Sequence, residues 1–246
     1  MRRRDLLAGL GALGLTGPAC AAPRPGMARR VCLSVGISRY RAGPALPSAL
    51  PDARLIARGL SAAGFAAYLL EDPTQEELLL ALAALRLQAA RAELAVIYVA
   101  GHGFMCGGQS HVLPADAPFD GTGALPESLL LQAISDQPRQ RVLFLDTCRE
   151  TVPLRPAGSA CSTGAPHSLG GVHVGYATQP GAPALDGEDG HSPFARALHR
   201  LLQRPGLDLG ELSRQLRLDV LRETQGRQIP WERSSLLAPV TLNPAD

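Results

Sequence analysis

Two short apolar runs constrain the fold of this chain more than any other feature. Residues 94–100 and 142–145 are continuous apolar stretches of strand length, and each is followed at once by glycine or polar residues. Strands buried on both faces of a parallel sheet have this pattern, whereas a half-exposed strand alternates apolar and polar residues. The two runs therefore predict a parallel sheet that is covered on both faces.

The rest of the chain alternates between strand and helix patterns. Further strands are predicted at residues 31–37, 66–70, 172–176 and 236–242. Helices are predicted at residues 52–63, from Thr74 to about Arg91, at 194–202 and at 207–222. Gly64 follows the first helix in the usual C-terminal position, and Thr74 with Glu77 forms a capping box at the start of the second. This order predicts an α/β fold with a mostly parallel central sheet and helices on both faces.

Composition excludes several classes of protein. Of 246 residues, 46% are apolar and 19% charged, which excludes a disordered chain. No stretch approaches ~20 uninterrupted apolar residues, so we expect no membrane span. All 24 basic residues are arginine, and Arg2, Arg3 and Arg4 against Asp5 account for the net charge of +2. The neutral remainder gives no electrostatic reason to expect a nucleic-acid partner.

The first 22 residues have the layout of a secretory signal. A basic tip precedes an apolar run at residues 6–17 and small residues around Cys20. The pair Arg3-Arg4 resembles the twin-arginine export signal of bacteria. We therefore expect a signal at 1–22, a linker at 23–30, and export to the periplasm or beyond. A lipoprotein anchor at Cys20 is not expected, because the preceding residues fit a lipobox poorly.

Two residues at predicted strand ends could carry chemistry. His102 follows the run 94–100, and Cys148 follows the run 142–145. Sites in open α/β sheets form at the carboxyl ends of strands, so parallel neighbours would place this pair in one cleft. A thiol beside an imidazole is an activated nucleophile. The alternative is that both are core residues, since cysteine and histidine are often buried for packing alone.

The sequence around this pair resembles a known family. Residues 96–103 (VIYVAGHG) and 143–149 (LFLDTCR) resemble the two catalytic motifs of caspase-like cysteine peptidases, and most closely the bacterial orthocaspase and metacaspase branch. Further likenesses occur in the same order at 31–40, 50–53, 176–181, 186–187, 192–194, 228–231 and 234–236. The resemblance implies a caspase-like domain over 31–242, with a large-subunit-like part at 31–150, a loop at 151–171 and a small-subunit-like part at 172–242.

The resemblance also implies roles for individual residues. Cys148 would be the nucleophile, His102 would transfer protons, and the backbone N–H groups of Gly103 and Cys148 would form the oxyanion hole. Asp52 and Asp146 would line a pocket that selects Arg or Lys before the cleaved bond. Each aspartate has an alternative role, Asp52 as a helix N-cap and Asp146 as a turn residue at a strand end.

The function implied is that of a cysteine endopeptidase that cleaves protein or peptide substrates after Arg and also after Lys. We expect it to be a monomer without a cofactor; the acidic calcium-binding clusters of some metacaspases are not evident, and calcium activation stays open. Self-cleavage in the loop 151–171, which contains Arg155, is a further hypothesis.

Rival functions differ in the sequence features they need. A catalytically silent caspase-fold scaffold would normally lack the cysteine or the histidine, and both are present here. A zinc site could be drawn from His102, Cys106, His111 and another thiol, but the spacing matches no common ligand pattern. Cys106 and Cys161 could instead form a disulfide or be inert. A nucleotide-binding domain would need a glycine-rich loop after the first strand, where residues 38–41 read SRYR.

Overall fold

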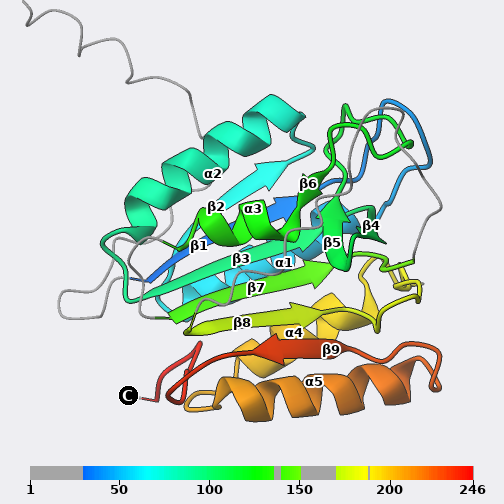
Figure 1. The fold of residues 1–246 in the computed structure, drawn as a ribbon. Coiled ribbons are helices and arrows are strands. Elements are labelled where there is room, and N and C mark those ends of the chain that lie inside the picture. The colour runs from blue at the N-terminus through cyan, green and yellow to red at the C-terminus, as the bar shows by residue number, and fades with distance from the viewer. Residues whose placement is uncertain (1–29, 136–139, 151–169, 188, 246) are drawn as a thin grey trace, which may run out of the picture.

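A six-stranded sheet forms the centre of the molecule. The computed structural model describes residues 30–135, 140–150, 170–187 and 189–245. The sheet has the order β2-β1-β3-β7-β8-β9, and only β9 runs antiparallel to its neighbour (Figure 1). Its strands are β1 (Arg30–Gly36), β2 (Ala66–Glu71), β3 (Leu94–Ala100), β7 (Gln140–Asp146), β8 (Val172–Tyr176) and β9 (Trp231–Ser234). The predicted α/β fold with a mostly parallel sheet is confirmed.

The two apolar runs form adjacent strands in the middle of this sheet. β3 is buried along its whole length, and β7 is buried from Val142 onward. The two strands pair in parallel, with Leu94 opposite Gln140 and Ala100 opposite Asp146. Their carboxyl ends therefore lie side by side at one edge of the sheet, as the sequence predicts.

Helices cover both faces of the sheet and divide its core into two clusters (Figure 1). One face packs against α1 (Ala49–Ala62), α4 (Pro193–Leu202) and α5 (Leu209–Glu223), and the other against α2 (Gln75–Ala89) and α3 (Glu127–Gln132). Because side chains alternate along a strand, Tyr98 and Phe144 face the first group, whereas Ile97 and Leu143 face the second. Burying each such side chain stabilises the fold by roughly 2 kcal/mol.

A second, three-stranded sheet follows β3 directly and was not predicted. It consists of β4 (Gly103–Cys106), β5 (Gln109–Val112) and β6 (Leu125–Pro126), all antiparallel. These strands are two to four residues long and include the buried polar residues Gln109, Ser110 and His111. Such short, polar strands leave no apolar pattern in a sequence.

The predicted edge strand at residues 236–242 is wrong. In that segment only Thr241 pairs, in an isolated bridge with Asp208. The edge of the sheet is instead β9, which pairs with β8 from Trp231 to Ser234. β9 is exposed or half-buried throughout, so its Trp-Glu-Arg-Ser sequence lacks the apolar pattern of the inner strands.

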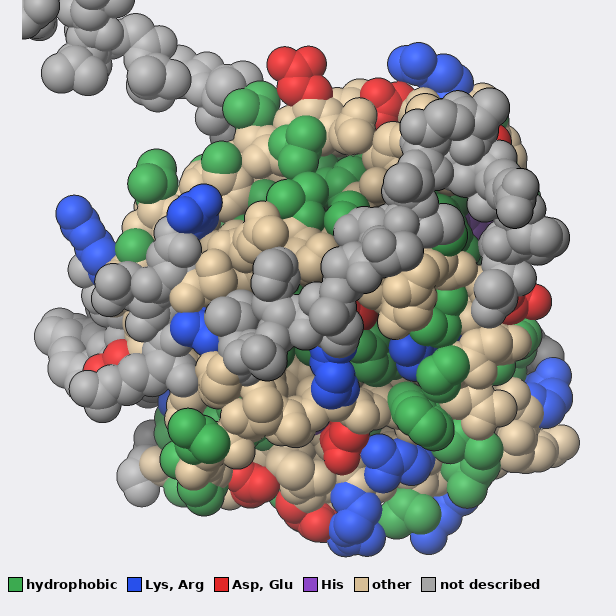
Figure 2. All heavy atoms as spheres, in the orientation of Figure 1, with side chains coloured by type: hydrophobic (Ala, Val, Ile, Leu, Met, Phe, Trp, Pro, Cys, Tyr) green, Lys and Arg blue, Asp and Glu red, His purple; other side chains and the backbone are tan. Residues whose placement is uncertain are grey.

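The surface carries charges of both signs. Figure 2 shows arginine and acidic side chains interspersed over the lower part of this view. Ion pairs include Arg214–Glu211 within α5 and Arg200–Asp219 between α4 and α5. Leu80 and Leu87 of α2 are exposed. Within the described residues, no helix combines the length and the apolar character needed to cross a bilayer. The predicted signal, the linker up to residue 29, Cys20, Arg155 and Cys161 lie outside the described residues.

The capping box of α2 gives a test of the fold. The Thr74 hydroxyl accepts a hydrogen bond from the Glu77 backbone N–H, and the Glu77 carboxylate accepts one from the Thr74 backbone N–H. Thr74→Ala leaves one of these N–H groups without its partner, so the free energy of unfolding is expected to fall by about 1 kcal/mol. Urea denaturation measures this change, and Thr74→Ser, which keeps the hydroxyl, should restore most of it.

Candidate active site

Cys148 lies two residues beyond the carboxyl end of β7 and has a half-buried thiol. Its Sγ atom lies 3.4 Å from the backbone N of Ala184 and 3.7 Å from the Ala184 carbonyl oxygen. Burial raises the pKa of the Cys148 thiol, the Ala184 N–H lowers it, and Glu150, Asp146 and Asp186 raise it further. Without a ligand the thiol is therefore protonated at neutral pH.

His102 lies two residues beyond the carboxyl end of β3 and is held in one tautomer. Its Nε2 atom lies 2.9 Å from the carbonyl oxygen of Pro44. A carbonyl can only accept, so the proton of the neutral ring is on Nε2 and Nδ1 is the basic atom. Burial lowers the pKa of His102, which favours this neutral form. The imidazole is thus ready to accept a proton at Nδ1.

Two aromatic residues hold the His102 ring in place. The Tyr40 hydroxyl accepts a hydrogen bond of 2.7 Å from the His102 backbone N–H, and the two ring centroids are 4.6 Å apart. Phe119 contacts the imidazole edge-on, with centroids 4.9 Å apart. A Cβ on Gly101 would lie only 2.8 Å from the Tyr40 hydroxyl, so this contact requires glycine before the histidine.

The structure brings the ends that carry His102 and Cys148 together, as the pairing of β3 with β7 requires. The Gly101 N–H donates to the Asp146 carbonyl across this junction, at 3.3 Å. Within the described part of the chain, no hydrogen bond joins the imidazole to the thiol. Gly103 packs beside the same junction, since a Cβ there would lie 2.8 Å from the Thr147 side chain.

A pocket that is open to solvent lies beside the thiol, and we call it the acidic pocket. Three carboxylates, those of Asp52, Asp146 and Asp186, line it together with Cys148. The other lining residues are uncharged: Leu46, Ser48, Ala49, Ala100, Gly101, Thr147, Ala184, Leu185 and Ser192. Among the residues described, the wall of the pocket therefore carries acidic side chains and no Arg or Lys.

Asp52 and Asp146 are buried and are joined through Ser192. The Ser192 hydroxyl donates to Asp146 at 2.6 Å and its backbone N–H to Asp52 at 3.1 Å. Tyr98 also donates to Asp146, at 2.8 Å, and Nδ1 of His191 lies 2.7 Å from Asp52. Burial raises the pKa of Asp52 to about 7; burial and the nearby Asp52 charge raise that of Asp146 to about 7.

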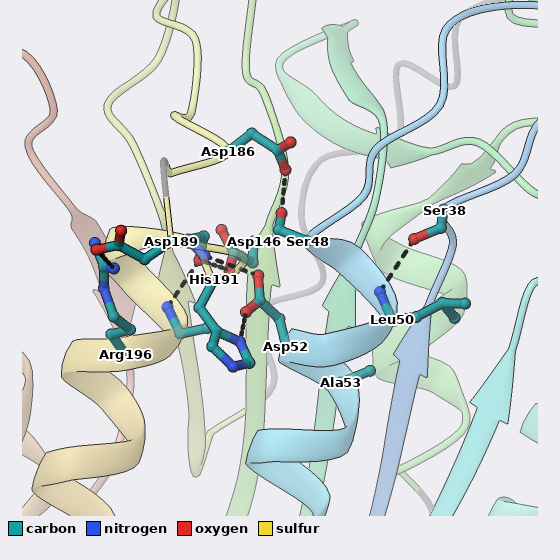
Figure 3. A network of polar contacts seen from close by, with 12 residues as sticks. Ser38, Ser48, Leu50, Asp52, Ala53, Asp146, Asp186, Asp189, His191 and Arg196 are labelled. Carbon is teal, nitrogen blue, oxygen red and sulfur yellow. Dashed lines mark hydrogen bonds and ion pairs between the residues drawn. The ribbon is translucent and has the colours of Figure 1, made fainter.

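The nearest cation does not neutralise this pair. Arg196 lowers the pKa of Asp52 through space, but its guanidinium is bound to Asp189 and Glu223. Figure 3 shows Arg196 turned toward Asp189. Among the described residues, His191 is the basic group in contact with Asp52, and Asp146 has no basic partner, so a proton or a bound cation would lower the cost of burying the two charges.

The alternative roles of the two aspartates are not those observed. Asp52 is not an N-cap, because α1 begins earlier, at Ala49, after the N-cap residue Ser48. Asp146 is the last residue of β7, and its buried carboxylate accepts from the side chains of Tyr98 and Ser192 rather than from a turn.

The third carboxylate, that of Asp186, had no predicted role in the pocket, although residues 186–187 belong to the resemblance. Asp186 lies in the segment after β8 and accepts a hydrogen bond from the Ser48 hydroxyl (Figure 3). Its charge raises the pKa of Cys148 and of both buried aspartates. An acidic residue shortly after a strand that neighbours β7 was the available signal, but nothing in the local pattern shows that this segment folds over the thiol.

Cys106 and His111 are two residues that the sequence offered for a disulfide or a zinc site. Cys106 is disulfide-bonded, whereas Cys148 is a free thiol. His111 stacks on Phe104, with ring centroids 5.2 Å apart. Among the residues described, no group of three or more His, Cys, Asp or Glu side chains could hold a metal ion.

Comparison with known proteins gives one family and one fold. The family model described as the caspase domain matches residues 29–241. Caspase-1 from Spodoptera frugiperda has a similar structure, with a TM-score of 0.68 and 14% sequence identity over 88% of this chain and 90% of that one. That likeness shows the fold alone. None of the curated proteins matches the chain.

The buried carboxylates should make the fold less stable at alkaline pH. The pKa of Asp146 is higher in the folded than in the unfolded protein, so burying its ionised carboxylate destabilises the fold. This destabilisation is largest above about pH 7, decreases as the pH falls toward about 4, and is absent at lower pH. Asp146→Asn is therefore expected to raise the free energy of unfolding at about pH 8 by about 1–3 kcal/mol, and to change it little near pH 4. Chemical denaturation at both pH values measures this. The control Asp120→Asn, at an exposed carboxylate, should not raise the free energy of unfolding at about pH 8. If Asp146→Asn does not raise it either, the prediction is wrong.

Proposed function

The chain belongs to the caspase domain family, and from this we propose that it is a cysteine endopeptidase that cleaves peptide bonds after Arg and also after Lys. One observation supports the specificity above all others. The candidate nucleophile Cys148 adjoins a pocket that contains two buried carboxylates and, in the part of the chain that the structure describes, no basic side chain.

The electrostatics of the acidic pocket favour a basic substrate side chain. A guanidinium group has several donors and a positive charge, so it can bridge Asp52 and Asp146 and replace the protons they otherwise need. An ammonium group supplies the charge with fewer fixed donors, which supports Arg as the better substrate. An acidic side chain would meet three carboxylates and be repelled.

The proposed reaction begins when a proton passes from the Cys148 thiol to Nδ1 of His102. The thiolate attacks the scissile carbonyl carbon, and its oxygen becomes an oxyanion. When the C–N bond breaks, the imidazolium donates its proton to the leaving amine and a thioester remains. Water then hydrolyses the thioester, with His102 as the base, and the free thiol is restored.

Backbone donors would stabilise the oxyanion. We assign this role to the N–H groups of Gly103 and Cys148, which belong to the two strand ends that meet at the site. The close contact of Gly103 with Thr147 supports the assignment, because a larger residue would push these ends apart.

Other parts of the proposal concern the cell rather than the chemistry. We propose that the enzyme is exported through its N-terminal signal and acts as a monomer on protein or peptide substrates. Cleavage within 151–171 and activation by calcium are hypotheses that peptide mapping and chelation experiments would address.

Substitutions at the site test the proposed activity. Cys148→Ala is expected to abolish hydrolysis of a fluorogenic peptide ending in Arg, because no nucleophile is left. Asp146→Asn is expected to lower kcat/KM for that peptide about a hundredfold, since it removes one partner of a buried ion pair. Asp120→Asn is the surface control. A well-folded wild-type protein that cleaves neither basic nor acidic peptides would favour the scaffold function instead.

The pH dependence of substrate binding gives a separate test. As pH falls through about 7, the carboxylates of the acidic pocket take up protons and attract a guanidinium less. KM for the Arg peptide is therefore expected to rise between about pH 8 and pH 6. In Asp146→Asn only Asp52 of the buried pair is left to take up a proton, so the rise in KM should be smaller. Steady-state kinetics that give a constant KM over this range would contradict the prediction.

A further inference from the structure

Gln228 connects the end of α5 to the segment that covers the candidate nucleophile. Its side chain is buried, with 1% exposed. Its Oε1 atom accepts a hydrogen bond of 2.9 Å from the Leu185 backbone N–H, and its Nε2 donates one of 2.9 Å to the Ala177 carbonyl. One amide thus joins the carboxyl end of β8, where Ala177 follows the strand, to the segment 182–186.

The segment 182–186 contributes two groups to the site. The N–H of Ala184 lies against the Cys148 sulfur and lowers the pKa of that thiol. Asp186 supplies the third carboxylate of the acidic pocket. Leu185, which Gln228 binds, lies between them in the chain. A displacement at Leu185 would therefore move the donor to the sulfur and the charge in the pocket together.

The backbone of Gln228 is itself held firmly. Thr224, the buried C-cap of α5, accepts a hydrogen bond of 3.1 Å from the Gln228 N–H, and its hydroxyl also donates to Val220 within the helix. The turn closes through Gln225 and Gly226, both with positive φ. The amide therefore projects from a fixed point and does not simply follow the segment it binds.

We propose that Gln228 is a positioning residue of this active site, which fixes the segment 182–186 so that Ala184 contacts the Cys148 sulfur and Asp186 faces the acidic pocket. It acts on the reaction only through this segment. The proposal rests on the proposed peptidase function for its kinetic consequences, whereas its effect on the thiol stands apart from any turnover.

Gln228→Met keeps the size of the side chain and removes both hydrogen bonds. We expect kcat/KM for the Arg peptide to fall about tenfold through both kcat and KM. Alkylation of Cys148 by iodoacetamide is followed by mass spectrometry of the Cys148 peptide as a function of pH. In Gln228→Met the midpoint of this profile should move to higher pH, because the thiolate loses its N–H donor. Gln228→Glu can supply both hydrogen bonds only when protonated, so its kcat/KM relative to wild type should recover as pH falls.

Gln109→Met is the matched control. Gln109 is also a buried glutamine, and its side chain accepts from the Ser128 backbone N–H, away from the segment 182–186. If Gln228→Met loses no more stability than this control yet changes the alkylation profile and KM, the proposal holds. An unchanged alkylation profile and KM in Gln228→Met would overturn it. If the alkylation profile differs between wild type and Gln228→Met as expected but the wild-type protein cleaves no peptide, the peptidase function is refuted and the role of Gln228 is not.

Discussion

The parallel pairing of β3 with β7 is the constraint on which the site depends. β3 is buried along its whole length and β7 is buried from Val142 onward, and their register sets Ala100 opposite Asp146. Because each strand is covered by helices on both faces, a shift of one residue would turn every core side chain to the wrong cluster. The same burial that stabilises the sheet thus determines that the residues after its strands, His102 and Cys148, emerge at one edge.

The buried carboxylates of the acidic pocket lower the stability of the fold. Asp52 and Asp146 are buried close together, which no packing requirement of α1 or β7 explains, and Arg196 is occupied elsewhere. Hydrogen bonds from Ser192 and Tyr98 offset part of the cost of burying the charges. A chain selected only for stability would carry apolar side chains here, so the surviving carboxylates support a role in binding a cation.

The sequence predicted those features that depend on local patterns or on long apolar runs. The inner strands, the four long helices and the capping box at Thr74 are of this kind, and so is the meeting of the ends of β3 and β7, whereas the six-residue helix α3 was missed. Edge elements were missed or misplaced, since β4 to β6 are short and β9 is half exposed. Tyr40, Asp186 and Gln228 lie in segments that contribute to the family resemblance, but their roles depend on contacts between distant segments, which a local pattern does not show.

The division of the site between the two parts of the chain has a consequence for its integrity. Cys148 and His102 precede the undescribed segment 151–169, whereas Ala184, Asp186 and Gln228 follow it. The parts are joined by the β7–β8 ladder and by the contacts of α1 with α4. Two polypeptides encoded separately on either side of that segment would therefore be able to reassemble by fragment complementation.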